Sequence, residues 1–209
     1  MTPSGEIMKT GASRLFQRSL LIAAAGILAL MLAACTGRGG GQLPPGGTFK
    51  AAASFGFTFS CQDSGGLNPP RGQLKIELSY TDKGSNPLGS AFGIHGIVDR
   101  IDPVLESAIC IGTNPPPGGN ELIFLGRYYP TSSPPAGFAQ SCKVGKTSTT
   151  PLCRFEVIVR DNDQNGVPSV RDYFQITLSS ATAVTSKLDP ASVFYTRAGL
   201  LSSGNLTVD

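Results

Sequence analysis

The residues from Asp161 to Asp172, DNDQNGVPSVRD, carry oxygen atoms at positions that a calcium ion would use. Calcium takes about six to eight hard oxygen ligands, which loops of this kind supply at alternate positions. The candidate ligands are five side chains and one main-chain carbonyl, those of Asp161, Asp163, Asn165, Val167 (carbonyl), Ser169 and Asp172. The last position holds Asp where Glu is usual. An Asx-rich hairpin turn is the alternative, because Asp, Asn and Gly favour turn geometry on their own.

His95 is the only histidine of the chain, so a hydrolase of the Ser-His-Asp type would have to use it. Asp99 or Asp102 would orient it, but no GxSxG motif supplies the serine. A glycosidase would need two carboxylates at one cleft, and no motif brings any two of the candidates together. Those candidates are Asp63, Glu77, Asp82, Glu106, Glu121 and Glu156. We therefore predict no catalytic residue and a structural role for His95.

Tyr128 and Tyr129 stand next to Arg127 and ahead of a Pro-rich stretch. Two neighbouring aromatic rings on a surface would suit a sugar or a peptide. Successive residues of a strand point to opposite faces, however, which favours one ring in the core and one outside.

The N-terminus has the layout of an export signal. Residues 1–18 carry three basic side chains and one acidic one, and residues 19–34 are uncharged and rich in Leu, Ile and Ala. This order of a basic and then an apolar segment is typical of a secretory signal. The apolar stretch ends in Leu32-Ala33-Ala34-Cys35, which resembles the lipobox of bacterial lipoproteins. The resemblance implies cleavage before Cys35 and a diacylglyceryl group on its sulfur. Two or more acyl chains anchor a protein stably.

Four further cysteines, Cys61, Cys110, Cys142 and Cys153, would then lie in an oxidising compartment. An even number of cysteines in an exported chain predicts two disulfides. Three pairings are open, and we favour Cys142–Cys153, which closes a short polar loop, with Cys61–Cys110 as the second bridge. Closely spaced CxxC pairs are absent, so zinc is not expected.

Composition points to a small all-β protein. Removal of residues 1–34 leaves 14 basic and 13 acidic residues, so no basic footprint for nucleic acid remains. Short segments with a period of two, parted by Gly and Pro, favour an antiparallel β-sandwich or jelly roll. The predicted strands cover residues 51–60, 73–81, 91–101, 104–111, 121–129, 153–160, 173–179 and 204–208, and residues 130–150 are predicted to form a surface loop.

The order of these segments resembles the post-COAP domain of secreted and surface-attached bacterial proteins. The matching text, ASFGFTFSC, GQLKIELSYTDKG, IHGIVDRI, CRFEVIVRDNDQNGVPSVRDYFQITLSS and GLLSSGNLTV, spans roughly residues 50–209. The chain departs from that pattern in a long insertion over residues 112–150 and in the extended turn after Asp161. The resemblance implies a small extracellular β-sandwich and attaches no catalytic residue to it.

Together these observations predict a signal peptide over residues 1–34, a lipidated Cys35 with a flexible Gly- and Pro-rich tether over 35–47, and one β-sandwich over 48–209. The expected function is that of a non-catalytic envelope lipoprotein with a structural, adhesive or partner-binding role. A carbohydrate- or peptide-binding module is the alternative, and an envelope polysaccharide or ester hydrolase is a third. The expected partners are the membrane, through the lipid, and an envelope protein or glycan. Calcium is the one cofactor suggested. Thr36 is not Asp, which favours the outer membrane in a host that has one.

Overall fold

The computed structural model describes residues 35–63, 72–97, 120–162, 170–183, 185 and 187–208. Side chains of residues 35, 61–63 and 72–74 are outside this description. The described residues belong to one compact unit, Ala34–Asp209. The predicted signal peptide and the predicted strand over 104–111 lie outside the described residues.

All the described strands are antiparallel and form one sheet. They are β1 (Cys35–Leu43), β2 (Ala53–Asp63), β3 (Gly72–Asp82), β4 (Phe92–Ile97), β5 (Glu121–Pro130), β6 (Cys153–Arg160), β7 (Tyr173–Ser179), β8 (Val193–Leu200) and β9 (Ser203–Val208). The order across the sheet is β8-β7-β6-β5-β4-β3-β2-β1-β9. Two short 3-10 turns, η2 (Gln140–Cys142) and η3 (Pro190–Ser192), complete the described elements. The predicted all-β antiparallel class is confirmed.

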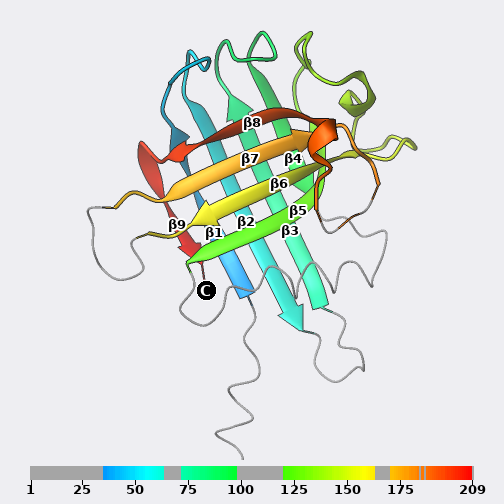
Figure 1. Ribbon diagram of the computed structural model, residues 1–209. Helices are drawn as coiled ribbons and strands as arrows, with labels where there is room; N and C mark the ends of the chain where they lie inside the picture. The colour runs from blue at the N-terminus through cyan, green and yellow to red at the C-terminus, as the bar shows by residue number, and fades with distance from the viewer. Residues whose placement is uncertain are drawn as a thin grey trace, which may run out of the picture. The chain divides into compact units, whose positions relative to one another are not determined.

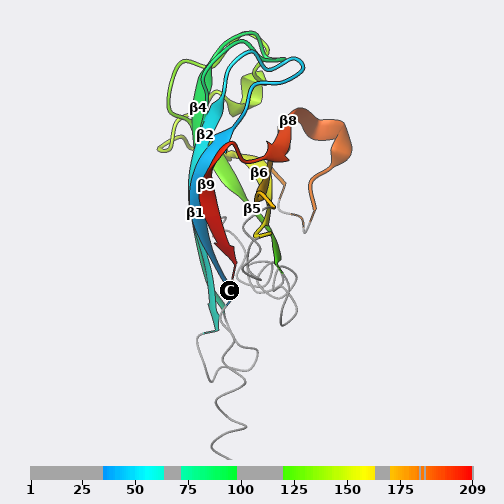
Figure 2. The ribbon, with the colours of Figure 1, turned by 90° about the vertical axis from the view of Figure 1, so that its left-hand side faces the viewer.

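The sheet folds over itself into two layers. Strands β6 to β8 cross in front of β1 to β4 in Figure 1, and Figure 2 shows the two layers edge-on. Strand β5 links them, since its residues up to Tyr128 pair with β6 while Arg127–Pro130 pair with β4. A Cβ on Gly126 would lie 2.5 Å from the carbonyl oxygen of Ile97 and 2.7 Å from the Phe155 ring. Glycine therefore lets the layers come together where β5 passes between them.

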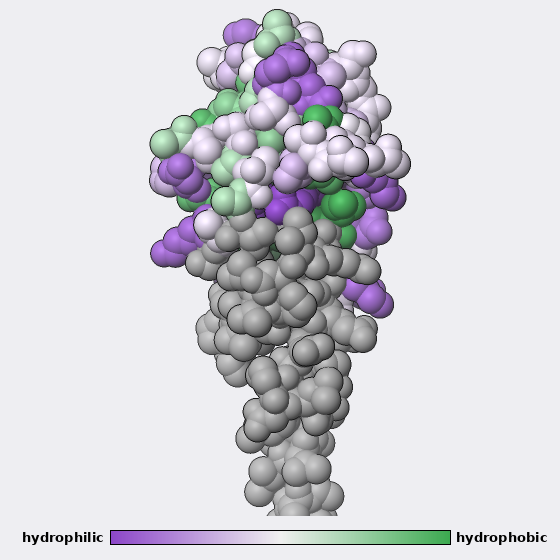
Figure 3. Space-filling model, turned by 90° about the vertical axis from the view of Figure 1, so that its right-hand side faces the viewer, coloured by the Kyte–Doolittle hydropathy of each residue, from purple (hydrophilic) through white to green (hydrophobic). Residues whose placement is uncertain are grey.

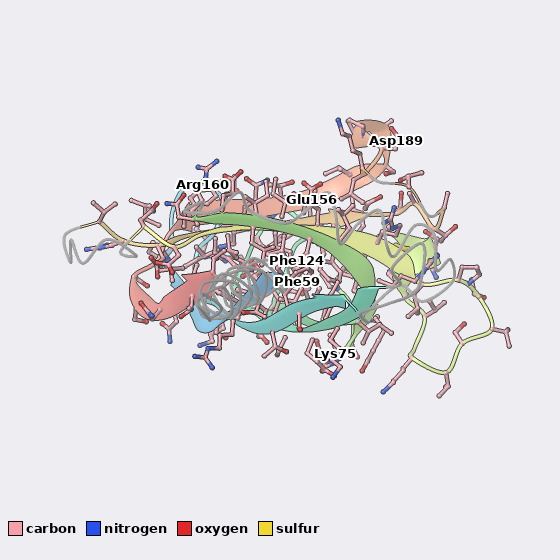
Figure 4. All side chains as sticks on the ribbon, turned by 90° about the horizontal axis from the view of Figure 1, so that it is seen from below. Phe59, Lys75, Phe124, Glu156, Arg160 and Asp189 are labelled. Carbon is pink, nitrogen blue, oxygen red and sulfur yellow. A yellow bond between two sulfur atoms is a disulfide. The ribbon has the colours of Figure 1, made fainter. Side chains whose placement is uncertain are left out.

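Aromatic side chains fill the space between the layers. Phe55 of β2 stacks on Phe174 of β7 with ring centroids 3.6 Å apart, and Phe59 lies 5.3 Å from Phe124. Figure 4 shows Phe59 and Phe124 meeting between the layers, while Lys75 and Glu156 point away on opposite outer faces. The period of two seen in the sequence thus separates core from surface. Burial of the predicted inward residues of β6, among them Phe155, Val157 and Val159, is confirmed.

The prediction of a flexible tether is wrong for residues 35–43, which form β1 between β2 and β9. The glycines of this segment allow close packing. A Cβ on Gly37 would lie 2.4 Å from Leu122, and one on Gly41 would lie 2.5 Å from the carbonyl oxygen of Ser203. The folded domain therefore begins about a dozen residues before the predicted boundary at Thr48. The loop over residues 44–52, in which Gly46 pairs with Phe49, separates β1 from β2.

Strand β8 was not predicted from the sequence. Its inward residues include Arg197, only 2% exposed, and a charged residue at an inward position breaks the alternation by which strands are found. The predicted loop over 130–150 is confirmed in outline, since η2 is the only regular element described between β5 and β6.

Candidate functional site

The first candidate site is the start of β1, where the predicted lipidated cysteine lies. The backbone of Cys35 opens β1 and pairs with Cys61 of β2. Pairing with β9 begins two positions later, at Gly37 opposite Val208. Cys35 is therefore the first residue of β1 in the described part of the chain, and the compact unit begins one residue before it, at Ala34. A group attached to Cys35 would join the sheet with no intervening linker.

The second candidate is the predicted calcium loop, of which the structure describes the two ends. Asp172 accepts hydrogen bonds from the backbone N–H of Asn162 (3.0 Å) and from that of Leu206 in β9 (2.8 Å). Asp161 accepts one from the backbone N–H of Val208 (3.3 Å). Both carboxylates are nearly fully buried.

Strand β9 ends the sheet on its side, so N–H groups on its outer edge have no neighbouring strand among the described elements. Exposed edges of this kind invite pairing with other chains, and proteins cover them. Asp161 and Asp172 supply that cover from the β6–β7 connection. Among residues with described side chains, no three His, Cys, Asp or Glu groups converge on one point. The other candidate calcium ligands, Asp163, Asn165, Val167 and Ser169, lie outside the described residues. Calcium binding stays a prediction, which titration calorimetry of the folded domain tests.

A polar recess of about 200 Å³ lies beside these carboxylates. Arg171, Asp172, Ser202, Ser203 and Asn205 contribute to its lining. The recess is open to solvent. Of its two charged lining residues, Arg171 and Asp172, the latter already accepts a hydrogen bond from the backbone N–H of Leu206.

His95 lies on the outer face of β4. Its Nε2 is 3.3 Å from the carboxylate of Glu77, whose side chain is 70% exposed, and its ring centroid is 5.3 Å from that of Tyr129. Ser79 stands opposite His95 in the register of β3 and β4. No hydrogen bond between this serine and His95 is present in the described part of the chain, and such a bond is what a nucleophile and its base require. Asp99 and Asp102 lie outside the described residues.

The two neighbouring tyrosines point to opposite faces, as the alternation predicts. Tyr128 is fully buried and donates a hydrogen bond to the carbonyl oxygen of Ser179 (3.2 Å). Burial strongly raises the pKa of Tyr128. Tyr129 is half-buried on the outer face beside His95. A platform of two adjacent tyrosine rings is therefore absent here, and the outward ring of Tyr129 has the His95 ring as its neighbour.

The candidate carboxylates with described side chains each have a different basic neighbour, and the structure does not pair any two of them. Glu121 binds exposed Arg160, Glu77 lies beside His95, and Asp82 binds Arg197 in the interior. Glu156 lies half-buried on the outer face of β6, where burial raises its pKa and the nearby Arg154 lowers it. The side chains of Asp63 and Glu106 are outside the described residues.

Sequence reasoning missed a buried polar cluster around Arg197 and Asp82. Arg197 donates to Asp82 (2.8 Å), to the carbonyl oxygen of Ala51 (2.8 Å) and to that of Pro44 (3.0 Å). Tyr195 donates to the same Asp82 oxygen (2.8 Å) and lies 2.5 Å from the Tyr80 hydroxyl. Desolvation is the main cause that raises the pKa of both tyrosines, so both hydroxyls stay protonated far above neutral pH. The cluster ties β3 and β8 to the β1–β2 loop.

Cys142 and Cys153 form a disulfide, which confirms the favoured pairing. It joins η2 to the start of β6 and so fixes the loop between β5 and β6. Cys110 and the side chain of Cys61 lie outside the described residues, so the second bridge stays a prediction.

No family model matches the chain, and neither the curated proteins nor the solved structures that were searched contain a match. The resemblance to the post-COAP domain therefore stays a prediction. Within the described residues, no helix has the length and apolar character needed to cross a bilayer.

Proposed function

We propose that the chain is an extracytoplasmic bacterial lipoprotein, cut before Cys35 and anchored to a membrane by lipid on that cysteine. The observation that carries this proposal is the coincidence of two boundaries. The lipobox-like Leu32-Ala33-Ala34-Cys35 spans the point at which the compact unit Ala34–Asp209 begins, and β1 already includes Cys35, the first described residue. A peptidase that cuts after Ala34 would remove the predicted signal and leave every described strand of the sheet intact.

The absence of a tether at β1 changes how such an anchor would work. A flexible linker over residues 36–47 would hold the domain at a distance of ~20 Å. With β1 starting at Cys35, the lipid would join the sheet directly. The domain would then lie against the lipid headgroups, with the end of the sheet that contains Cys35 next to the membrane. The disulfide Cys142–Cys153 supports an oxidising location.

We infer that the sandwich acts through its surface rather than by catalysis. Buried charged groups that might do chemistry hold the fold together instead. Asp82 fixes a loop through Arg197, and Asp161 and Asp172 cover the edge of β9. An envelope protein or glycan is the partner that we expect for such a module.

Fractionation of cells that express the full chain tests the anchor. The unchanged protein is expected in the membrane fraction, and Cys35→Ala is expected in the soluble fraction or as uncut precursor. Thr36→Ala is the matched control, since it changes the next residue of β1 and leaves the sulfur in place. Far-ultraviolet circular dichroism of each purified variant checks the fold. Cys35→Ala that stays with the membrane as a cleaved, folded domain would contradict the proposal.

A carbohydrate- or peptide-binding module is the second candidate, favoured by one observation. Tyr129 and His95 form an outward ring pair on the layer of β1 to β4. Apolar faces of sugars stack on such rings. An array of neutral envelope glycans would test it with Tyr129→Ala, and Tyr173→Ala is the control on the other layer. Equal binding by both variants would remove this candidate.

A further inference from the structure

Three loops form the end of the sandwich opposite Cys35. Strand β1 runs from Cys35 toward this end, where the chain turns through residues 44–52, 83–91 and 131–152 (Figure 1). Backbone hydrogen bonds join the loops. Lys50 donates to Ser85 (2.9 Å), Lys83 donates to Ala52 (3.3 Å), and Gly137 donates to Leu88 (3.0 Å). We call these three loops the distal end.

The charge of the distal end has one sign. Its loops contain Lys50, Lys83, Lys143 and Lys146 and no Asp or Glu. Lys143 is partly exposed, and the other three lysines are exposed. None of the four forms an ion pair with a described residue. The chain after residue 34 is nearly neutral, so the basic character belongs to this end rather than to the protein as a whole.

The distal end is also held rigidly. Arg197 binds the carbonyl oxygens of Pro44 and Ala51 in the first loop. In the second, the Asn86 side chain donates to Gly84 and Ser90 and accepts from the N–H of Leu88. The disulfide Cys142–Cys153 fixes the third. A surface that is already ordered loses less entropy on binding, which favours affinity.

The surface chemistry of the distal end suits a polymer better than a membrane. Membrane insertion uses exposed large apolar side chains. The large hydrophobic residues that are exposed in the described structure, Val170 and Leu200, lie outside these loops. Figure 3, viewed from the side of the β5–β6 loop, shows mostly hydrophilic residues and pale ones of intermediate hydropathy, with smaller hydrophobic areas between them. A single exposed lysine contributes little to binding an anion, so the ligand must engage several lysines at once.

We propose that the distal end binds a polyanionic envelope polysaccharide that bears repeated carboxylate or phosphate groups. Repeated negative charge along one polymer matches lysines spread over three fixed loops. The direction in which this end faces, away from the anchoring membrane, rests on the proposed function. The binding itself depends only on the folded domain.

A binding assay with the domain 35–209, in which Cys35→Ala removes the cysteine, tests this inference. The ligands are polygalacturonate and long-chain polyphosphate, and neutral dextran is the control polymer. Fluorescence anisotropy is expected to show binding to at least one polyanion and none to dextran. Raising the salt from ~0.05 to ~0.5 M should weaken it by about tenfold or more. The triple variant Lys50→Gln, Lys83→Gln, Lys146→Gln should lose about tenfold in affinity, as expected for several weak charge contacts.

A matched triple variant separates a local site from net charge. Lys75→Gln, Arg160→Gln and Lys187→Gln remove the same charge elsewhere and should leave affinity unchanged. Equal losses in both triples would overturn the proposal, as would binding to neither polyanion. Stronger binding to vesicles that contain phosphatidylglycerol would assign the distal end to a lipid surface instead. All these outcomes are independent of whether Cys35 carries lipid.

Discussion

Replacing Arg197 with methionine is expected to destabilise the domain by ~3–5 kcal/mol, the usual cost of breaking a buried ion pair on one side. Methionine keeps the unbranched stem but removes the donors to Asp82, Pro44 and Ala51. Asp82, with no exposed surface, would keep only Tyr195 and a long contact from the Gly84 N–H (3.4 Å) as partners. Unfolding free energies are typically ~5–15 kcal/mol, so the loss is a large fraction of the total.

Urea and thermal denaturation of the domain 35–209, followed by circular dichroism, measure this loss. A domain of this size shifts its melting temperature by ~2–4 °C per kcal/mol, so a fall of ~6–20 °C is expected. Arg160→Met is the matched control, since Arg160 pairs with Glu121 on the surface and its side chain is 49% exposed. That change should cost less than ~1 kcal/mol.

The double variant Asp82→Leu, Arg197→Met isolates the electrostatic part. It removes both buried charges, so it should be more stable than Arg197→Met alone. A cost below ~1 kcal/mol for Arg197→Met, or a double variant no more stable than that single one, would refute the reasoning.

Three further predictions follow from the fold. A fragment over residues 48–209 lacks β1 and should show no cooperative unfolding by circular dichroism, whereas the domain 35–209 should unfold cooperatively. A sharp transition in the short fragment would mean that the fold does not need β1. Asp172→Ala leaves a buried N–H group (Leu206) and a partly buried one (Asn162) without their acceptor, and it should cost ~2–4 kcal/mol in urea denaturation. No change in stability would show that water replaces the carboxylate. Burial raises the pKa of Glu156 above its ordinary value of 4.5, so the free energy of unfolding should fall as pH rises from 4.5 through the raised pKa. Urea midpoints measured at about pH 4 and pH 7 should show this fall for the unchanged domain and not for Glu156→Gln. The same fall in Glu156→Gln would assign the pH dependence to other groups.

Alternation along the chain predicted most of the strands that the structure describes, because each has one apolar face. The alternation failed to predict strands in which close packing or a distant partner, and not hydrophobicity, determines which residue type occupies a position. In β1 the core leaves no room for side chains at Gly37 and Gly41, so the strand has the composition of a linker. In β8 the inward Arg197 is stabilised by Asp82, 115 positions away, and a local pattern carries no information on that partner.

For the loop from Asp161 to Asp172, the sequence indicated which residues carry oxygen atoms but not which groups those atoms contact. Asp161 and Asp172 were predicted as oxygen ligands of a calcium loop, and in the structure both are buried and accept hydrogen bonds from backbone N–H groups. Their N–H partners in β9 lie 47 and 34 positions further along the chain, and only the folded sheet brings them together. The short separation of Cys142 and Cys153, 11 positions, is why that pairing was predictable from sequence.

Intact-mass spectrometry of the protein purified from membranes of a lipoprotein-processing bacterium tests the central claim most directly. The proposal predicts a chain that starts at Cys35 and carries the added mass of a diacylglyceryl group, with Cys35→Ala lacking that mass. An N-terminus at any other residue, or an unmodified Cys35 in the mature chain, would contradict it.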